Sequence, residues 1–180
     1  MFRQMIAGVA GSLAVISLAA AHVTLENPEA AVGASYKAVL RVNHGCDGSP
    51  TVSLRVRMPE GVVAVKPMPK QGWKLDVVSG KYVKPVTQNG TRISEGVTEL
   101  SWSGGKLPEA FYDEFVFQAG FSDELKPGQT IYFPVVQECE KGIHRWIEIP
   151  TGQEAHGGRD AHGAAGSEPA PGLKLMPARR

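Results

Sequence analysis

The chain lacks the motifs that mark several large classes of protein. It has only two cysteines, Cys46 and Cys139, and they are too far apart to form a Cys-x-x-Cys pair. It also carries no catalytic serine motif, no phosphate-binding loop and no pair of catalytic carboxylates. Hydrolase and redox-relay activities therefore have no support in the sequence, and we expect a protein that is not an enzyme.

An excess of charge of one sign is missing as well. The formal net charge is +1, and the first 21 residues hold Arg3 and no acidic residue, so a chain without them is formally neutral. Proteins that bind nucleic acid or anionic membranes usually present a basic face. We therefore expect neither as a partner.

The N-terminal segment has the pattern of a signal peptide. A short cationic start is followed by an apolar run from Met5 to Ala21, which is shorter than the roughly 20 residues that a membrane-spanning helix needs. The run ends in three alanines, which signal peptidases accept. We expect cleavage after Ala21, export to the periplasm or cell envelope, and a mature chain that begins with His22.

Alternation of apolar and polar residues with a period of two predicts β-strands between residues 22 and 150. The expected strands cover 35–43, 52–58, 61–65, 73–78, 97–102, 114–121, 130–136 and 143–149. Turn-forming residues such as Asn89-Gly90 separate nearly all of them, and no convincing helical period lies between. Short strands at this spacing predict an all-β sandwich or barrel, with aromatic side chains filling the space between two sheets.

After Pro150 the composition changes to glycine, alanine, proline and charged residues. This predicts a flexible tail over residues 151–180 without packed structure. The expected organisation is thus a signal peptide (1–21), one domain (22–150) and the tail. His156 and His162 lie in the tail, where solvated residues are the simpler interpretation and loose metal scavenging is the alternative.

Two cysteines in a chain bound for an oxidising compartment predict a Cys46–Cys139 disulfide. The alternative, two thiolate metal ligands, requires a reducing environment. A disulfide would hold two histidine-containing segments near each other, because His44 lies just before Cys46 and His144 lies just after Cys139.

A histidine at a free amino terminus offers two nitrogen ligands, the α-amine and the ring Nδ1, which can close a six-membered chelate around one metal ion. Nitrogen ligands favour Cu(II) among the divalent first-row metals, with zinc second. The mature chain has only the scattered Met58, Met68 and Met176, so it lacks a thioether cluster that would favour Cu(I). A single terminal histidine also arises by chance, so the site needs further ligands.

Strand alternation in the segment 143–149 places His144, Trp146 and Glu148 on one face. Ile147 and Ile149 then face the core, and Trp146 lies outside it, where it shields a surface metal or caps the sandwich edge. In the other segment, His44 is either a second imidazole ligand or a loop histidine. Asp47 is either a carboxylate ligand or a turn former.

Several segments resemble the YcnI-like family of exported bacterial copper-binding proteins. These are Ala21-His22-Val23-Thr24-Leu25-Glu26-Asn27-Pro28, Met58-Pro59-Glu60-Gly61-Val62, Pro69-Lys70-Gln71-Gly72-Trp73, Leu100 with Trp102, and Arg145-Trp146. They follow one another in one consistent order over residues 22–150, and the sequence is similar to a cysteine-containing branch of the family.

The resemblance implies a two-sheet β-sandwich, immunoglobulin-like or cupredoxin-like. It also implies one Cu(II) held by a monohistidine brace: the amine and ring of His22, a carboxylate, and Trp146 nearby. Where some relatives carry a glutamate after a Val-Pro pair, this chain has Asn43-His44-Gly45-Cys46-Asp47. The third ligand is therefore either His44 or Asp47.

The function implied by the resemblance is copper binding in the cell envelope, for uptake, storage or delivery. The expected partners are a membrane copper transporter or a periplasmic copper chaperone. One alternative is a copper-dependent oxidase in which His44 or His144 completes the site. The other is a metal-free interaction domain that binds another protein through a sheet edge or exposed aromatic residues.

Overall fold

The structure is a computed structural model, and it describes residues 22–150 and 167–178. The expected signal peptide and the tail histidines His156 and His162 lie outside the described residues. Neither described range contains a helix long and apolar enough to cross a membrane.

The described residues form strands joined by turns and loops. The strands are β1 (Thr24–Leu25), β2 (Glu29–Ala31), β3 (Tyr36–Val42), β4 (Thr51–Arg57), β5 (Val62–Pro67), β6 (Lys74–Gln88), β7 (Thr91–Leu107), β8 (Asp113–Phe121), β9 (Thr130–Tyr132), β10 (Val135–Cys139), β11 (Ile143–Trp146) and β12 (Gly172–Met176).

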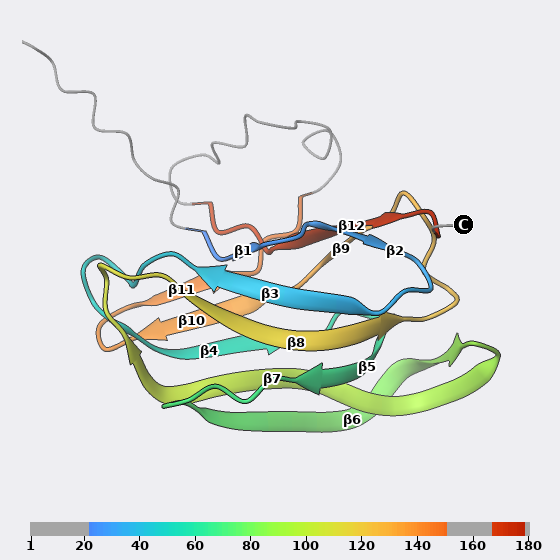
Figure 1. Cartoon of the computed structure of the whole chain (residues 1–180), viewed down its shortest axis with the longest axis horizontal. Coiled ribbons are helices and arrows are strands. Elements are labelled where there is room, and N and C mark those ends of the chain that lie inside the picture. The colour runs from blue at the N-terminus through green and yellow to red at the C-terminus, as the bar shows by residue number, and fades with distance from the viewer. Residues whose placement is uncertain (1–21, 151–166, 179–180) are drawn as a thin grey trace, which may run out of the picture.

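Two of the three sheets form a sandwich, which confirms the all-β prediction (Figure 1). One has four strands in the order β1-β3-β8-β5, and the other has five in the order β11-β10-β4-β7-β6. A third sheet joins β2, β12 and β9, with β12 parallel to β2 and antiparallel to β9. The strand β11 thus lies at one edge of the five-stranded sheet and β6 at the other.

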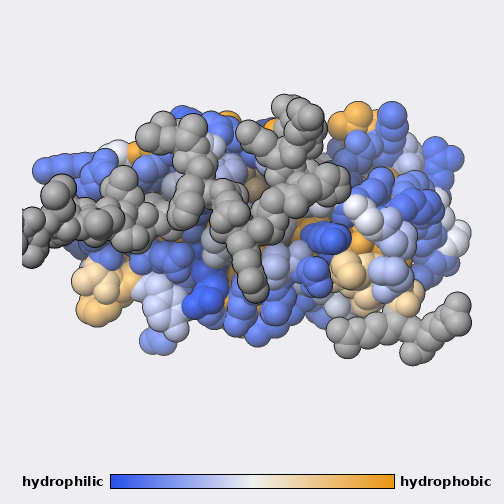
Figure 2. Space-filling view, turned by 90° about the horizontal axis from the view of Figure 1, so that it is seen from above, coloured by the Kyte–Doolittle hydropathy of each residue, from blue (hydrophilic) through white to orange (hydrophobic). Residues whose placement is uncertain are grey.

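The core lies between the sheets, where most strands bury an apolar face. Its largest fully buried side chains include Trp102, Phe115, Phe117 and Phe133, as the aromatic content predicted. Figure 2 shows one outer face, where hydrophilic residues predominate and hydrophobic ones gather in a few separate patches.

The predicted strands are found, and several of them differ in extent from the prediction. Strands β6 and β7 are much longer than predicted and meet at Asn89-Gly90, where both residues have positive φ (51° and 76°), a conformation that asparagine and glycine accept. The predicted strand over 130–136 is divided into β9 and β10 around Phe133-Pro134. Proline has no N–H to donate to a sheet, which explains this break.

The expected flexible tail is wrong for residues 167–178. Strand β12 lies there, and Leu173 and Leu175 are completely buried in the core cluster. Backbone hydrogen bonds between Glu148 and the residues Glu168 and Ala170 hold the beginning of this segment beside the end of β11. The domain therefore takes in β12, because two leucines alternating with Lys174 supply apolar surface that the third sheet buries.

Candidate metal centre

His22 is positioned by the residues that follow it. Val23 and Leu25 are buried, and β1 pairs with β3 through Thr24 opposite Arg41 and Leu25 opposite Leu40. The half-buried His22 is thus fixed at the start of the sandwich. Its imidazole lies 5.2 Å from the indole of Trp146 between ring centroids, at an interplanar angle of 65°.

Trp146, the last residue of β11, is buried in the core cluster with 2% of its surface exposed. The imidazole of His144, two residues earlier on the same face, stacks on its indole with centroids 4.9 Å apart. The expectation that Trp146 lies outside the core is therefore wrong. Ile147 and Ile149 are 46% and 55% exposed, so the prediction that they face the core is also wrong.

The orientation of β11 follows from the size and chemistry of the indole. Burial removes more apolar surface from water for a tryptophan than for an isoleucine. The indole N–H also finds a partner inside the protein, because Trp146 Nε1 donates to Gln137 Oε1 at 3.1 Å. The strand ends at Trp146, so its alternation no longer sets where Ile147 and Ile149 point.

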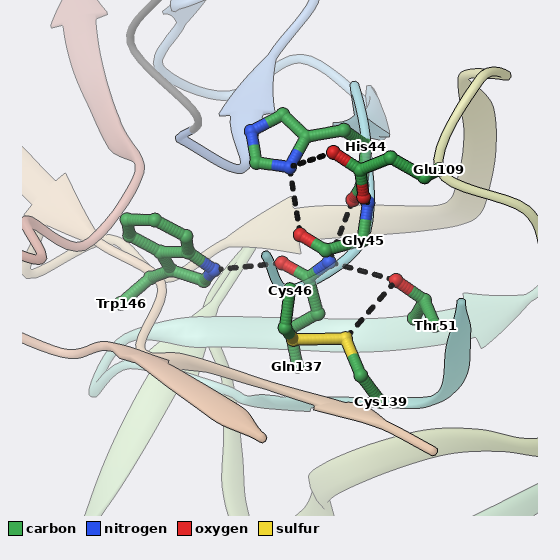
Figure 3. Close-up of polar contacts among 8 residues, drawn as sticks. All are labelled: His44, Gly45, Cys46, Thr51, Glu109, Gln137, Cys139 and Trp146. Atoms are coloured by element: carbon green, nitrogen blue, oxygen red, sulfur yellow. Dashed lines mark hydrogen bonds and ion pairs between the residues drawn. A yellow bond between two sulfur atoms is a disulfide. The ribbon is translucent and has the colours of Figure 1, made fainter. Parts of the chain in front are cut away.

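Gln137 connects Trp146 to the segment that contains His44 (Figure 3). It lies on β10, facing inward with Val135 and Cys139, and only 1% of its surface is exposed. Its Nε2 donates to the backbone oxygen of His44 and to Thr51 Oγ1, both at 2.8 Å. Two segments far apart in sequence are thereby joined by one buried amide.

The His44 side chain is half-buried, and one of its ring nitrogens has a defined partner. Nδ1 lies 2.7 Å from the carbonyl oxygen of Gly45. A carbonyl oxygen only accepts, so Nδ1 donates, and in the neutral imidazole Nε2 is then the nitrogen with the lone pair. Figure 3 shows Nε2 directed away from Gly45 and Glu109. His44 therefore offers one nitrogen with the properties of a metal ligand.

Glu109 fixes the same loop from the other side. Its Oε2 accepts a hydrogen bond from Gly45 N at 2.7 Å, and its Oε1 lies 3.7 Å from His44 Nδ1. The Glu109 carboxylate next to Nδ1 favours a proton on that nitrogen. In the neutral imidazole, the other nitrogen, Nε2, is then the one that can bind a metal.

Asp47 lies away from these contacts. It is exposed at the tip of a turn closed by two backbone hydrogen bonds between Cys46 and Ser49, and its φ is 48°. Among the described residues, its side chain has no hydrogen bond or ion pair with His22, His44 or Trp146. The turn-forming role accounts for an aspartate at this position.

The Cys46–Cys139 disulfide is present, which confirms the predicted pairing and removes the thiolate-ligand alternative. It joins the turn after His44 to the end of β10, two residues beyond Gln137. Both histidine-containing segments are thereby attached to the same strand.

Three residues of this region were not predicted from the sequence: Gln137, Glu109 and Glu168. Glu168 accepts from Arg145 N at 2.8 Å and lies 2.6 Å from His144 Nδ1. Of the three, only Gln137 had a sequence signal, since it alternates with Val135 and Cys139 on the inward face of a strand. Glu109 and Glu168 contact histidines 65 and 24 positions away, where no local pattern applies.

The described ranges contain no group of three or more histidine, cysteine, aspartate or glutamate residues placed to hold a metal ion. A brace differs from such a cluster, because a single terminal histidine supplies two of its nitrogens. In the full chain the nitrogen of His22 is an amide joined to Ala21, and it becomes an amine only after cleavage. Nitrogen atoms suit Cu(II), so the candidate ligands are the amine that cleavage would free, the His22 ring and Nε2 of His44.

Comparison with known proteins identifies the domain. The chain is similar to an uncharacterized protein from Nocardia farcinica, whose crystal structure reveals an immunoglobulin-like fold. The TM-score is 0.59 with 23% sequence identity, over 87% of this chain and 99% of that one. None of the curated proteins matches. The model of the family described as "Domain of unknown function (DUF1775)" matches residues 22–175. Because this match spans most of the chain, the protein belongs to the DUF1775 family, which is the YcnI-like domain.

Proposed function

We propose that the protein is exported, loses its first 21 residues, and binds one Cu(II) ion through the amino-terminal His22. The sequence of the leader supports the cleavage site. The family match supports it as well, because it begins at residue 22. A brace requires a free amine, so the proposal depends on this cleavage.

The observation that carries the proposal is the contact between His22 and Trp146, with their rings 5.2 Å apart. A mobile terminal histidine would lose conformational entropy on binding a metal, whereas a ring already packed on a buried indole loses less. The indole also limits the access of water to one side of the histidine, which strengthens interactions with a bound ion.

His44 is the better supported third ligand, in place of Asp47. Its loop is fixed by Glu109, by Gln137 and by the nearby disulfide, and within residues 22–150 and 167–178 its Nε2 has no hydrogen-bond partner. The site would then be an all-nitrogen set, two atoms from His22 and one from His44, which suits Cu(II) better than harder metals.

The role we propose is non-enzymatic copper homeostasis in the periplasm or cell envelope, through uptake, storage or delivery. A membrane copper transporter or a periplasmic copper chaperone is the partner implied by the family resemblance.

The test compares two proteins: one that begins at His22, where the described fold also begins, and one with an extra alanine before His22. We expect the first to bind one equivalent of Cu(II) tightly in a titration, with an electron paramagnetic resonance spectrum typical of nitrogen ligands. The extra alanine turns the His22 amine into an amide and should weaken binding and change the spectrum. Equal affinity and equal spectra in the two proteins would rule out the brace.

A further inference from the structure

We infer that Gln137 is the positioning residue of this centre: its buried amide orients Trp146 and fixes the backbone of His44 at the same time. The inference rests on the proposed function for its metal readout, and on the geometry of three hydrogen bonds for the rest.

The orientation of this amide is fixed by its partners. An indole nitrogen only donates, so the atom facing Trp146 Nε1 must be the oxygen of the amide. A backbone carbonyl only accepts, so the atom facing the oxygen of His44 must be the amide nitrogen. Rotating the amide by half a turn would place two donors against each other and two acceptors against each other.

The hydrogen-bonding capacity of the side chain is also filled on the donor side. Both N–H groups of Nε2 are used, one by His44 and one by Thr51 Oγ1. Thr51 is completely buried and Gln137 is 1% exposed, so water has little access to the amide that joins them. Loss of the amide would leave the buried indole N–H of Trp146 without its partner, which is costly inside a protein.

Packing alone does not explain a glutamine here. The neighbouring inward positions of β10 are Val135 and Cys139, and Gln137 lies opposite Leu54 of β4 in the ladder. An apolar side chain would be the ordinary choice among such neighbours. The polar side chain is accounted for by what it connects, since two of its three partners, His44 and Trp146, belong to the two segments that carry candidate metal-contacting residues.

The geometry suggests how the centre depends on this amide. Trp146 provides the surface on which the His22 ring lies, and Gln137 holds the backbone of His44, the third ligand in the proposed centre. If either segment moves, the ring or backbone that it holds for the proposed centre moves with it. Partners outside the ligand set commonly alter metal affinity by about 10- to 100-fold when they are removed.

The experiment uses the full chain expressed for export, with the amino terminus of the purified protein verified by mass spectrometry. The test variant is Gln137→Met, which keeps the length of the side chain and removes its donors and acceptor. The matched control is Gln118→Met on β8, where an exposed glutamine donates one hydrogen bond to Ser35 Oγ. Two readouts are compared. The first is hydrogen exchange of the Trp146 indole N–H, measured by nuclear magnetic resonance. The second is Cu(II) binding, measured as the affinity and as the electron paramagnetic resonance spectrum of the bound ion.

We expect Gln137→Met to speed exchange of the Trp146 indole N–H and to weaken Cu(II) binding about tenfold or more, with a changed spectrum. The control should match the wild-type protein in both readouts. Wild-type exchange, affinity and spectrum in a folded Gln137→Met protein would overturn the inference and leave the proposed function intact. Failure of the wild-type protein itself to bind Cu(II) would overturn both.

A variant that does not fold would leave nothing to compare, so a second one is included. Gln137→Asn keeps the amide but shortens the side chain by one methylene, so it cannot reach both partners at once. It should also weaken Cu(II) binding and alter the spectrum, to a smaller extent. A Gln137→Asn protein identical to wild type in both readouts would count against the positioning role.

Discussion

The imidazole of His22 lies edge-on to the indole of Trp146, with ring centroids 5.2 Å apart. The other two tryptophans lie elsewhere, because Trp73 and Trp102 both pack on Phe115. Trp146 is thus the tryptophan whose ring contacts the first residue of the described fold. This gives the proposed centre a spectroscopic reporter of its own.

The first prediction concerns tryptophan fluorescence. Cu(II) is paramagnetic and quenches nearby fluorophores, so binding at His22 should quench Trp146 more than Trp73 or Trp102. We expect Trp146→Phe to remove the larger part of the Cu(II)-dependent quenching, and Trp73→Phe to retain it. Titration with Cu(II) and with zinc, which does not quench in this way, checks the effect. Equal quenching in Trp146→Phe and wild type would place the metal elsewhere.

The second prediction separates the two candidates for the third ligand. His44→Ala should weaken Cu(II) binding at least as much as loss of an outer partner does, about 10- to 100-fold. Asp47→Asn should change it little, since asparagine also tolerates the positive φ of this turn (48°) and Asp47 is exposed. Competition titrations against a chelator measure both. The reverse ranking would restore Asp47 as the ligand.

The strands were predictable from the sequence because alternation is a local signal. The extent of β6 and β7 was not, since their pairing continues through a stretch with a register shift between Lys81 and Val86. The strand β12 was missed because its short Leu-Lys-Leu alternation follows a segment dominated by glycine, alanine and proline. Composition over the whole tail concealed a five-residue pattern.

The candidate site was predictable only in part. His22 and Trp146 carry recognisable signals, and the structure brings them into contact. The inward face of β11 was predicted wrongly, because two isoleucines in the pattern outweighed one tryptophan. The network around Gln137 depends on contacts between residues 86 and 93 positions apart, which follow from sheet order and not from any local pattern.

The third prediction concerns the disulfide. Cys46 and Cys139 are 93 positions apart, and closing a loop of about this length restricts the unfolded chain by about 4 to 5 kcal/mol in the chain-entropy model. Removing a native disulfide commonly lowers the free energy of unfolding by about 2 to 5 kcal/mol. We expect the double variant Cys46→Ala, Cys139→Ala to lose stability in this range in urea unfolding. Added reductant should destabilise the wild-type protein and leave the double variant unaffected.

The fourth prediction concerns alkaline pH. Burial, with a smaller contribution from Glu26, raises the pKa of Tyr36, whose hydroxyl donates to Asn27 O at 2.7 Å. The folded state holds this proton more tightly than the unfolded state. The stability it contributes is therefore complete below the usual tyrosine pKa of about 10 and is lost as the pH rises above it.

Urea unfolding at pH values below and above the usual tyrosine pKa of about 10 checks this loss of stability. Tyr36→Phe should be less stable than wild type near neutral pH, by about 1 kcal/mol for the lost hydrogen bond, and should lose less stability at alkaline pH. Tyr112→Phe, at an exposed tyrosine, is the matched control and should follow wild type. Parallel pH curves for wild type and Tyr36→Phe would contradict the assignment.

The last prediction concerns β12, which makes the C-terminal segment part of the domain. Leu175 is completely buried, and replacing such a leucine with alanine costs about 2 to 5 kcal/mol, because it removes apolar contacts and leaves a cavity. Lys174 lies between the two buried leucines on the exposed face, so Lys174→Ala should stay within about 0.5 kcal/mol of wild type. A chain ending at Pro150 should lose β12 and its pairing with β2 and β9, and should unfold at lower urea concentration. If that shortened chain unfolds at the same midpoint as the full chain, β12 contributes nothing to the stability of the sandwich, and the domain ends near Pro150 after all.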